Sequence, residues 1–229
     1  MTSLELEEIL LHHDTKNTMF NNTQRTMKFV IVGDSNVGKT ALCKRIVQNN
    51  FSNFYTQSIG VNYNQTNFTT DGSDIVVQHL DIAGFERYSG ITQQYYQGAI
   101  GALVVFDMTN EKSLEAANFW KSDIDSKCCT STKEKIPCLL VGTKLDLKDK
   151  QEFFKTEDQL EQYAIENGYV GFQAVSSLDG TNVRTAYEKL ISYVISNNLE
   201  PYDVPLEPSE EEPDSCWQKF LKSFCCCWK

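Results

Sequence analysis

Apolar and polar positions follow two different rhythms along this chain. Short apolar runs, or runs that mix apolar and polar residues, predict strands at 28–32, 61–69, 74–80, 101–106, 137–142 and 170–175. Between them, apolar residues recur every three or four positions and predict helices at 39–48, 88–97, 111–127, 157–167 and 181–197. Because strands and helices alternate, the predicted fold class is α/β, with a six-stranded, mostly parallel sheet and helices on both faces.

Local signals refine this outline. Asp71-Gly72-Ser73, between the second and third strands, is a hairpin signal, so one strand is expected to be antiparallel. Thr156 and Gln159 form a capping box, and Gly168 is expected to end that helix. In the last helix, five apolar residues recur at helical spacing and are interpreted as a core face rather than a ligand site: Val183, Ala186, Tyr187, Leu190 and Val194.

The 229 residues divide into a polar N-terminal extension (1–26), one domain (27–197) and a tail (198–229). A short helical turn is conceivable between Ser3 and Leu11. The tail holds four of the five prolines, with seven Asp or Glu against three Lys, and is interpreted as an extended charged linker.

The formal net charge of −10 argues against nucleic acid as a main partner. No apolar run is long enough for a transmembrane helix, and the N-terminus does not resemble a signal peptide.

The eight cysteines have different surroundings. Cys43 and Cys138 stand in apolar contexts and are expected to be buried thiols. The adjacent Cys128 and Cys129 fall in a predicted polar loop, and their spacing suits neither a disulfide nor zinc. Without a secretory signal the compartment is reducing, so disulfides are not expected. The cluster at 225–227 lies close to the end of the sequence, which makes it a candidate for lipid attachment.

A glycine-rich stretch separates the first strand from the first helix. It matches the pattern G-x-x-x-x-G-K-[ST] in Gly33-Asp34-Ser35-Asn36-Val37-Gly38-Lys39-Thr40. Its glycines let backbone N–H groups face phosphate oxygens, and the helix adds the positive end of its dipole. Lys39 is expected to reach the terminal phosphates, and Thr40 to offer its hydroxyl to Mg²⁺. A chance Lys-Thr after an ordinary turn is the alternative, but the strand–loop–helix context favours nucleoside triphosphate binding.

A second signal concerns the base. Thr143-Lys144-Leu145-Asp146 follows a buried strand, and a carboxylate there can accept both the ring N–H and the exocyclic amine of guanine. Adenine lacks that pair of donors, so a buried carboxylate discriminates strongly between the two bases. Asp146, and the lack of a lid-like insertion, disfavour a P-loop ATPase or kinase.

With Asp81-Ile82-Ala83-Gly84 placed between these two motifs, the chain resembles the small GTPases, a class of P-loop NTPase, and among them the Rab family. The resemblance covers about 28–197 and the tail. The segment 120–127 is similar to the Rab subfamily of lysosome-related organelles, whereas 141–147 is similar to Rho proteins. The Rab-like segments are Ile59-Gly60-Val61-Asn62-Tyr63, Tyr88-Ser89-Gly90-Ile91-Thr92, Tyr95-Tyr96-Gln97-Gly98-Ala99 and Val104-Val105-Phe106-Asp107-Met108-Thr109.

The resemblance implies GTP or GDP and Mg²⁺ as ligands, with Lys39 and Gly84 acting on the terminal phosphates. Thr40 and Ser58 would ligate Mg²⁺, and Asp81 would hold it through water. Phe51 would flank the base, Tyr55 would close over the nucleotide, and the Ser177 N–H would meet the guanine oxygen. The implied nucleotide-binding set is Gly33, Asp34, Ser35, Asn36, Val37, Gly38, Lys39, Thr40, Ala41, Phe51, Tyr55, Ser58, Gly84, Thr143, Lys144, Asp146, Ser176, Ser177 and Leu178.

The resemblance also implies a switch. Residues 51–62 (the first switch) and 81–97 (the second switch) would be ordered by the γ-phosphate and Mg²⁺ and would then bind effectors. An exchange factor, a GTPase-activating protein and prenyl-carrier proteins are implied partners. The implied location is the cytoplasmic face of an endomembrane compartment, with cycling through the cytosol.

Several positions depart from the family pattern. Phe85 occupies the position of the glutamine that orients the attacking water, so it is counted among the catalytic positions as an impaired one. Ser58 replaces the usual threonine, Leu80 a tryptophan and Thr143 an asparagine. Asn36 is a polar substitution within the phosphate loop. Slow intrinsic hydrolysis of GTP to GDP and phosphate is therefore expected.

Two functional interpretations remain open at this point. One is a regulated GTPase switch in vesicle traffic, and the other is a GTP-loaded binding module that hardly hydrolyses. Both place the protein at a membrane through a prenylated tail. Cys226 and Cys227 are the expected lipid sites, with Cys225 competing. Because the acidic tail offers no polybasic support, two lipid chains are needed for stable anchoring.

Overall fold

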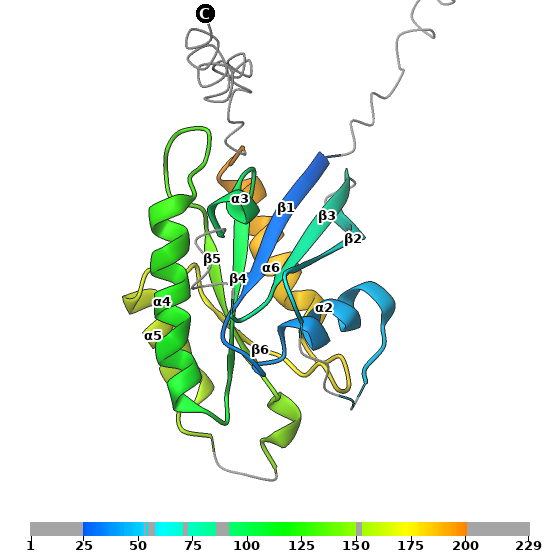
Figure 1. The fold of residues 1–229 in the computed structure, drawn as a ribbon, viewed down its shortest axis with the longest axis vertical. Helices are drawn as coiled ribbons and strands as arrows, with labels where there is room; N and C mark the ends of the chain where they lie inside the picture. Colours follow the sequence, from blue (N-terminus) through cyan, green and yellow to red (C-terminus); the bar gives the residue numbers. More distant parts are fainter. Residues whose placement is uncertain are drawn as a thin grey trace, which may run out of the picture.

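A single mixed sheet organises the domain in the computed structural model (Figure 1), which describes residues 25–52, 54, 58–70, 73–85, 92–149 and 153–200. Its strands follow the order β2-β3-β1-β4-β5-β6. Only β2 and β3 run antiparallel, and all other neighbours are parallel, which confirms the predicted fold class. The strands are β1 (Arg25–Val32), β2 (Val61–Thr70), β3 (Ser73–Ile82), β4 (Gly101–Asp107), β5 (Cys138–Thr143) and β6 (Phe172–Ala174).

Helices cover both faces of this sheet (Figure 1). One apolar core lies between the sheet and α3, α4 and α5, with Trp120 and Phe106 buried in it. The other lies between the sheet and α2 and α6, with Phe29 and Tyr187 buried in it. No described helix is both long enough and apolar enough to cross a membrane. The helices are α2 (Lys39–Gln48), α3 (Thr92–Tyr96), α4 (Glu111–Lys127), the 3₁₀ turn η2 (Leu145–Leu147), α5 (Glu157–Glu166) and α6 (Val183–Ser196).

The boundaries differ from the predicted ones where long-range pairing decides them. β1 begins at Arg25 rather than at residue 28, because Arg25 already pairs with Ile75 of β3. β6 is limited to the three residues that pair with β5. The helix predicted at 88–97 is α3, at 92–96; its earlier residues lie outside the described part. The turn at 71–72, the N-terminal turn and the terminal cysteines also lie outside it.

Other local predictions are confirmed. The Thr156 side chain accepts a bond from the Gln159 N–H, and Gln159 Oε1 accepts one from the Thr156 N–H. Cys43 and Cys138 are buried, as expected. The polar-loop prediction for Cys128 is wrong: it caps the end of α4 and its thiol is buried against the Tyr96 carbonyl at 3.4 Å.

Candidate functional site

The phosphate loop connects β1 to α2 at the carboxyl end of the parallel strands. Gly33 has φ +148°, and a Cβ atom there would lie 2.2 Å from the Val105 carbonyl oxygen, so only glycine fits. Gly38 is the N-cap of α2, has φ +97°, and leaves the first N–H groups of the helix without a side-chain cap. Asn36 is also left-handed, at φ 64°, a conformation that asparagine tolerates better than most residues. The loop therefore has the shape of an anion cradle.

Lys39 is held inside this loop. Its Nζ donates to the carbonyl oxygens of Gly33 (2.9 Å) and Asp34 (2.7 Å), and the residue is only 6% exposed. Burial lowers the pKa of the Lys39 ammonium to about 8, although the Asp81 and Asp34 carboxylates oppose this. A phosphate bound beside this ammonium would favour its charged form and so would raise its pKa again.

Three oxygen-bearing side chains meet beside Lys39, as the sequence predicts. Thr40 Oγ1 lies 2.8 Å from Ser58 Oγ and donates to Asp81 Oδ2 at 2.6 Å. Asp81 is only 1% exposed, and its other oxygen, Oδ1, is buried and has no hydrogen-bond partner among the residues that the structure describes. A buried carboxylate oxygen without a partner is costly, and hydroxyl and carboxylate oxygens are the ligands that Mg²⁺ takes. This donor set fits Mg²⁺.

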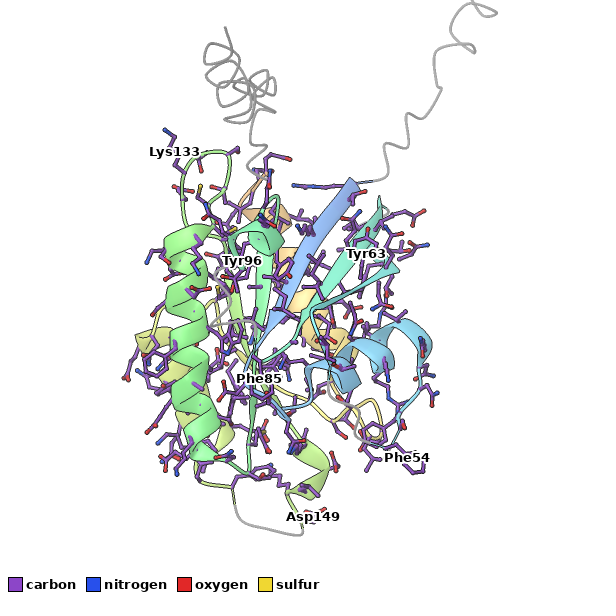
Figure 2. All side chains as sticks on the ribbon, viewed as in Figure 1. Phe54, Tyr63, Phe85, Tyr96, Lys133 and Asp149 are labelled. Atoms are coloured by element: carbon purple, nitrogen blue, oxygen red, sulfur yellow. The ribbon has the colours of Figure 1, made fainter. Side chains whose placement is uncertain are left out.

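The start of the second switch lies against the phosphate loop. A Cβ atom on Gly84 would come within 2.5 Å of the Ser35 nitrogen, so a glycine is needed for this close approach. The next residue, Phe85, lies near the lower end of β1 (Figure 2) and is 58% exposed. Its ring lines the same cavity as Ser35 and Lys39 and brings no hydrogen-bonding group to it.

The base-recognition residues lie at the end of β5. The Thr143 hydroxyl is buried between the carbonyl oxygens of Val37 (2.5 Å) and Phe106 (2.9 Å), which joins this strand to the phosphate loop. Lys144 is left-handed, with φ 64°, and its Nζ pairs with Asp107 Oδ2 at 2.5 Å. This ion pair fixes the direction of the loop that carries Asp146 into the cavity.

Asp146 is oriented by the loop at 176–178. Ser176 Oγ donates to Asp146 Oδ1 at 2.9 Å. That loop is in turn held by Arg45 of α2, whose Nε donates to the Ser177 carbonyl at 2.7 Å and whose other guanidinium nitrogens bond the carbonyls of Leu178 and Asn49. The role of Arg45 has no recognisable sequence signal, because the loop carbonyls of Ser177 and Leu178 that it bonds are more than 130 positions away.

These residues enclose one continuous cavity of about 410 Å³, a size ordinary for a small-molecule site. Gly33, Asp34, Val37, Ser176 and Asp81 support it without lining it, and Tyr55 lies outside the described residues. The predicted residues that do line it are Ser35, Asn36, Gly38, Lys39, Thr40, Ala41, Phe51, Ser58, Gly84, Phe85, Thr143, Lys144, Asp146, Ser177 and Leu178.

Sequence reasoning missed other lining residues, namely Lys44, Ser52, Phe54, Ala83 and Leu147. All are close neighbours of predicted residues along the chain. Lys44 was detectable, because it lies one helical turn after Thr40 and so shares its face of α2. Phe54 is 90% exposed and carries no pattern that marks it as part of a site.

Comparisons with known proteins agree with this geometry. The profile of the Ras family matches residues 28–196. "Ras-related protein Rab-32A" of Dictyostelium discoideum is 35% identical over 188 residues, which are 80% of this chain and 85% of that protein. "Ras-related protein Rab-7L1" of Rattus norvegicus is 34% identical over 174 residues (76% and 84%). "Ras-related protein Rab-32" of Sus scrofa is 33% identical over 210 residues (89% of each).

Ras-family proteins bind GTP or GDP with Mg²⁺ and are GTP hydrolases, and their Rab members act in membrane traffic. The match begins within β1 and includes the other five strands and every described helix, up to the last residue of α6. The relatives cover most of the chain at more than 30% identity. The chain therefore belongs to the Ras family and, within it, to the Rab small GTPases of the Rab-32 group.

Proposed function

We propose that this chain binds GTP and GDP in the 410 Å³ cavity and works as a membrane-traffic switch whose own hydrolysis is slow. The observation that carries the proposal is the convergence of three groups on that cavity. These are the phosphate loop around Lys39, the oxygen cluster of Thr40, Ser58 and Asp81, and the base-facing Asp146. In this proposal the first group binds phosphate, the second binds Mg²⁺ and the third binds guanine.

Each part of the cavity has a separate task in this proposal. Lys39 exchanges its two carbonyl partners for the terminal phosphates, which favour its charged form. Thr40 and Ser58 supply hydroxyl oxygens to Mg²⁺, which neutralises phosphate charge when bound. Asp146 accepts the guanine N–H groups, and Phe51 and Leu178 flank the base.

Hydrolysis needs a water molecule aimed at the γ-phosphorus. The water oxygen then bonds to phosphorus, the β–γ bridging oxygen leaves with GDP, and the water proton passes to phosphate. The Phe85 ring stands where the family places a glutamine and can neither accept nor donate the bond that orients this water. We therefore expect a long-lived GTP state, ended by residues that a GTPase-activating partner supplies.

Single-turnover hydrolysis by the GTP-loaded full chain tests the proposal. Phe85→Gln should raise the rate by roughly 10-fold or more, because a positioned group assists proton transfer and water orientation. Phe85→Leu is the matched control, since it changes the shape but adds no hydrogen-bonding group. Equal rates for wild type and Phe85→Gln would contradict the proposed role of Phe85. Failure to retain guanine nucleotide at all would contradict the proposed binding site.

The second candidate function is a binding module that hardly hydrolyses GTP. The exposed Phe85 ring favours it, because an apolar side chain at the cavity mouth also suits contact with an effector. The nucleotide bound after purification separates the two candidates. GTP that shows no measurable conversion to GDP supports the binding module, and slow but continuing decay to GDP supports the slow enzyme.

The membrane part of the proposal rests on the tail beyond the domain at 27–197. Prenyl groups on Cys226 and Cys227, with Cys225 competing, would hold the protein on the cytoplasmic face of an endomembrane. The two switches would then meet effectors and an exchange factor there, and a prenyl carrier would return the protein to the cytosol. Mass spectrometry of the native protein should show two lipids on the terminal cysteines; unmodified cysteines would remove this part.

A further inference from the structure

A buried carboxylate on α4 joins this helix to the end of the second switch. Asp123 Oδ2 accepts hydrogen bonds from the Tyr96 hydroxyl at 2.9 Å and from the Thr92 hydroxyl at 3.2 Å. Asp123 Oδ1 pairs with Lys127 Nζ at 2.5 Å. Lys127 also donates to the Thr92 oxygen at 2.8 Å, which closes the network. Both ends of the short helix α3 are thus bonded to one carboxylate.

This network is shielded from water. Thr92 and Tyr96 are both fully buried, and the Asp123 side chain is only 17% exposed. Burial and the neighbouring Asp123 charge raise the pKa of the Tyr96 phenol, so it stays a donor. Thr92 donates to Asp123 and accepts from Lys127, which uses its single proton and a lone pair without conflict. Each donor in this network therefore has an acceptor, and every partner is a protein side chain.

Further bonds hold the end of α3 from other directions. Lys28 of β1 donates to the Gln97 carbonyl oxygen at 2.5 Å, and the Cys128 thiol contacts the Tyr96 carbonyl. Figure 2 shows Tyr96 beside the upper half of α4. By contrast, Phe85 is 58% exposed. Within the segment 81–97, Phe85 and the residues 92–97 are therefore held very differently.

A second network on α4 makes a natural comparison. Asp125 accepts bonds from Lys121 at 2.7 Å and Lys135 at 2.9 Å, and it forms no hydrogen bond or ion pair with the described residues of α3. Like Asp123, it is a largely buried aspartate with lysine partners, and it lies only two positions further along the helix. Loss of its charge tests what ion pairs give to α4 and the segment that follows it, without involving α3.

We propose that Asp123 is a positioning residue that holds α3 on α4 in both the GDP and the GTP states. Rearrangement of the second switch with the nucleotide then ends before Thr92, and residues 92–96 present the same surface in both states. This proposal rests on the proposed nucleotide switch. It divides the segment 81–97 into a part that responds to the nucleotide and a part that does not.

Hydrogen exchange followed by mass spectrometry tests this on the full chain. Wild-type protein with Mg²⁺ and either GDP or a non-hydrolysable GTP analogue should show the same protection at 92–97 in both states, while 81–91 differs. Asp123→Asn should speed exchange at 92–97 by roughly 10-fold or more, because the neutral amide loses the ion pair and one acceptor oxygen. It should also make that exchange depend on the nucleotide, which a role in general stability would not do.

Asp125→Asn is the matched control and should leave exchange at 92–97 as in wild type. Tyr96→Phe removes one donor without changing charge and should give an intermediate effect. Equal effects of Asp123→Asn and Asp125→Asn, or wild-type protection at 92–97 that differs between the two states, would overturn the proposal. If the chain binds no guanine nucleotide, the proposed function fails. The comparison of Asp123→Asn with Asp125→Asn in the protein as purified would still decide the role of Asp123.

Discussion

At the scale of single residues, the cavity depends on side chains whose orientation is fixed by neighbours. Asp146 is aimed by Ser176, and Lys144 by Asp107. The buried Asp81 Oδ1 has no hydrogen-bond partner among the described residues, in keeping with a carboxylate that serves a ligand. Phe85 is the exception, since its ring faces the cavity and solvent without a polar contact of its own.

Asp146→Asn should reverse the base preference. The amide keeps one acceptor but presents a donor to the exocyclic amine of guanine, so two charge-assisted bonds are lost or opposed. Since each is worth about 1.5–3 kcal/mol, GDP affinity should fall by roughly 10²-fold or more. Xanthosine diphosphate has an oxygen in place of that amine and should bind the variant better than GDP does.

Competition with a fluorescent guanine nucleotide measures both affinities. Asp149→Asn, which removes an exposed carboxylate from the same loop, is the control and should change neither. An Asp146→Asn protein that still preferred GDP to xanthosine diphosphate would show that another group reads the base.

At the scale of elements, the packing of α6 on β3 contains an unusual polar contact. His79 of β3 is fully buried and meets the Tyr187 ring edge-on, with ring centroids 5.0 Å apart. Among the described residues, neither His79 nitrogen has a hydrogen-bond partner, and neither has the Tyr187 hydroxyl or the Thr66 hydroxyl on β2. Burial lowers the pKa of His79 to about 4. This face of the sheet is therefore sensitive to acid.

The stability of the domain should fall as the pH drops below the ordinary His pKa of about 6.5. The unfolded chain takes up the proton at that pH, whereas folded His79 resists it until about pH 4, so stability present above 6.5 is progressively lost. Between about pH 6.5 and pH 5 this loss is roughly 2 kcal/mol.

Urea unfolding at constant, saturating GDP and Mg²⁺ measures this loss. His79→Leu should remove most of the pH dependence in that window. Tyr187→Phe removes a buried hydroxyl from the ring that meets His79 but no titrating group in this range, so it should keep the pH dependence of wild type. The same slope for His79→Leu and wild type would contradict the assignment.

At the scale of the whole molecule, a contact was easier to predict from the sequence when its two residues lie close together along the chain. The phosphate loop was predictable because its strand, glycines, Lys39 and helix are contiguous, so one short pattern holds the geometry. The meeting of Ser58 and Asp81 with Thr40 followed from the family resemblance, and the fold then brought them within bonding distance. Contacts such as Lys144 with Asp107, or Cys128 with α3, join separate elements and leave no periodic trace.

The cavity and the described ends of the chain lie at opposite ends of the sheet (Figure 1). Arg25, the first described residue, donates to the Leu199 carbonyl at 2.9 Å and pairs with Glu200 at 3.2 Å. The tail thus leaves the domain beside the start of β1, whereas the phosphate loop follows its end. The cavity is left free of the tail's point of departure, whereas α3 lies toward the same end of the sheet as that point (Figure 1).

The guanidinium of Arg45 bears on how long a nucleotide stays. It sits on α2, which begins at the phosphate end of the cavity, and it bonds the loop at the base end. Under the proposed function, a nucleotide that loosens at one end would still be held at the other. Departure would then require both ends to open together. We therefore expect the residence time of the nucleotide to depend on Arg45, a side chain that does not line the cavity.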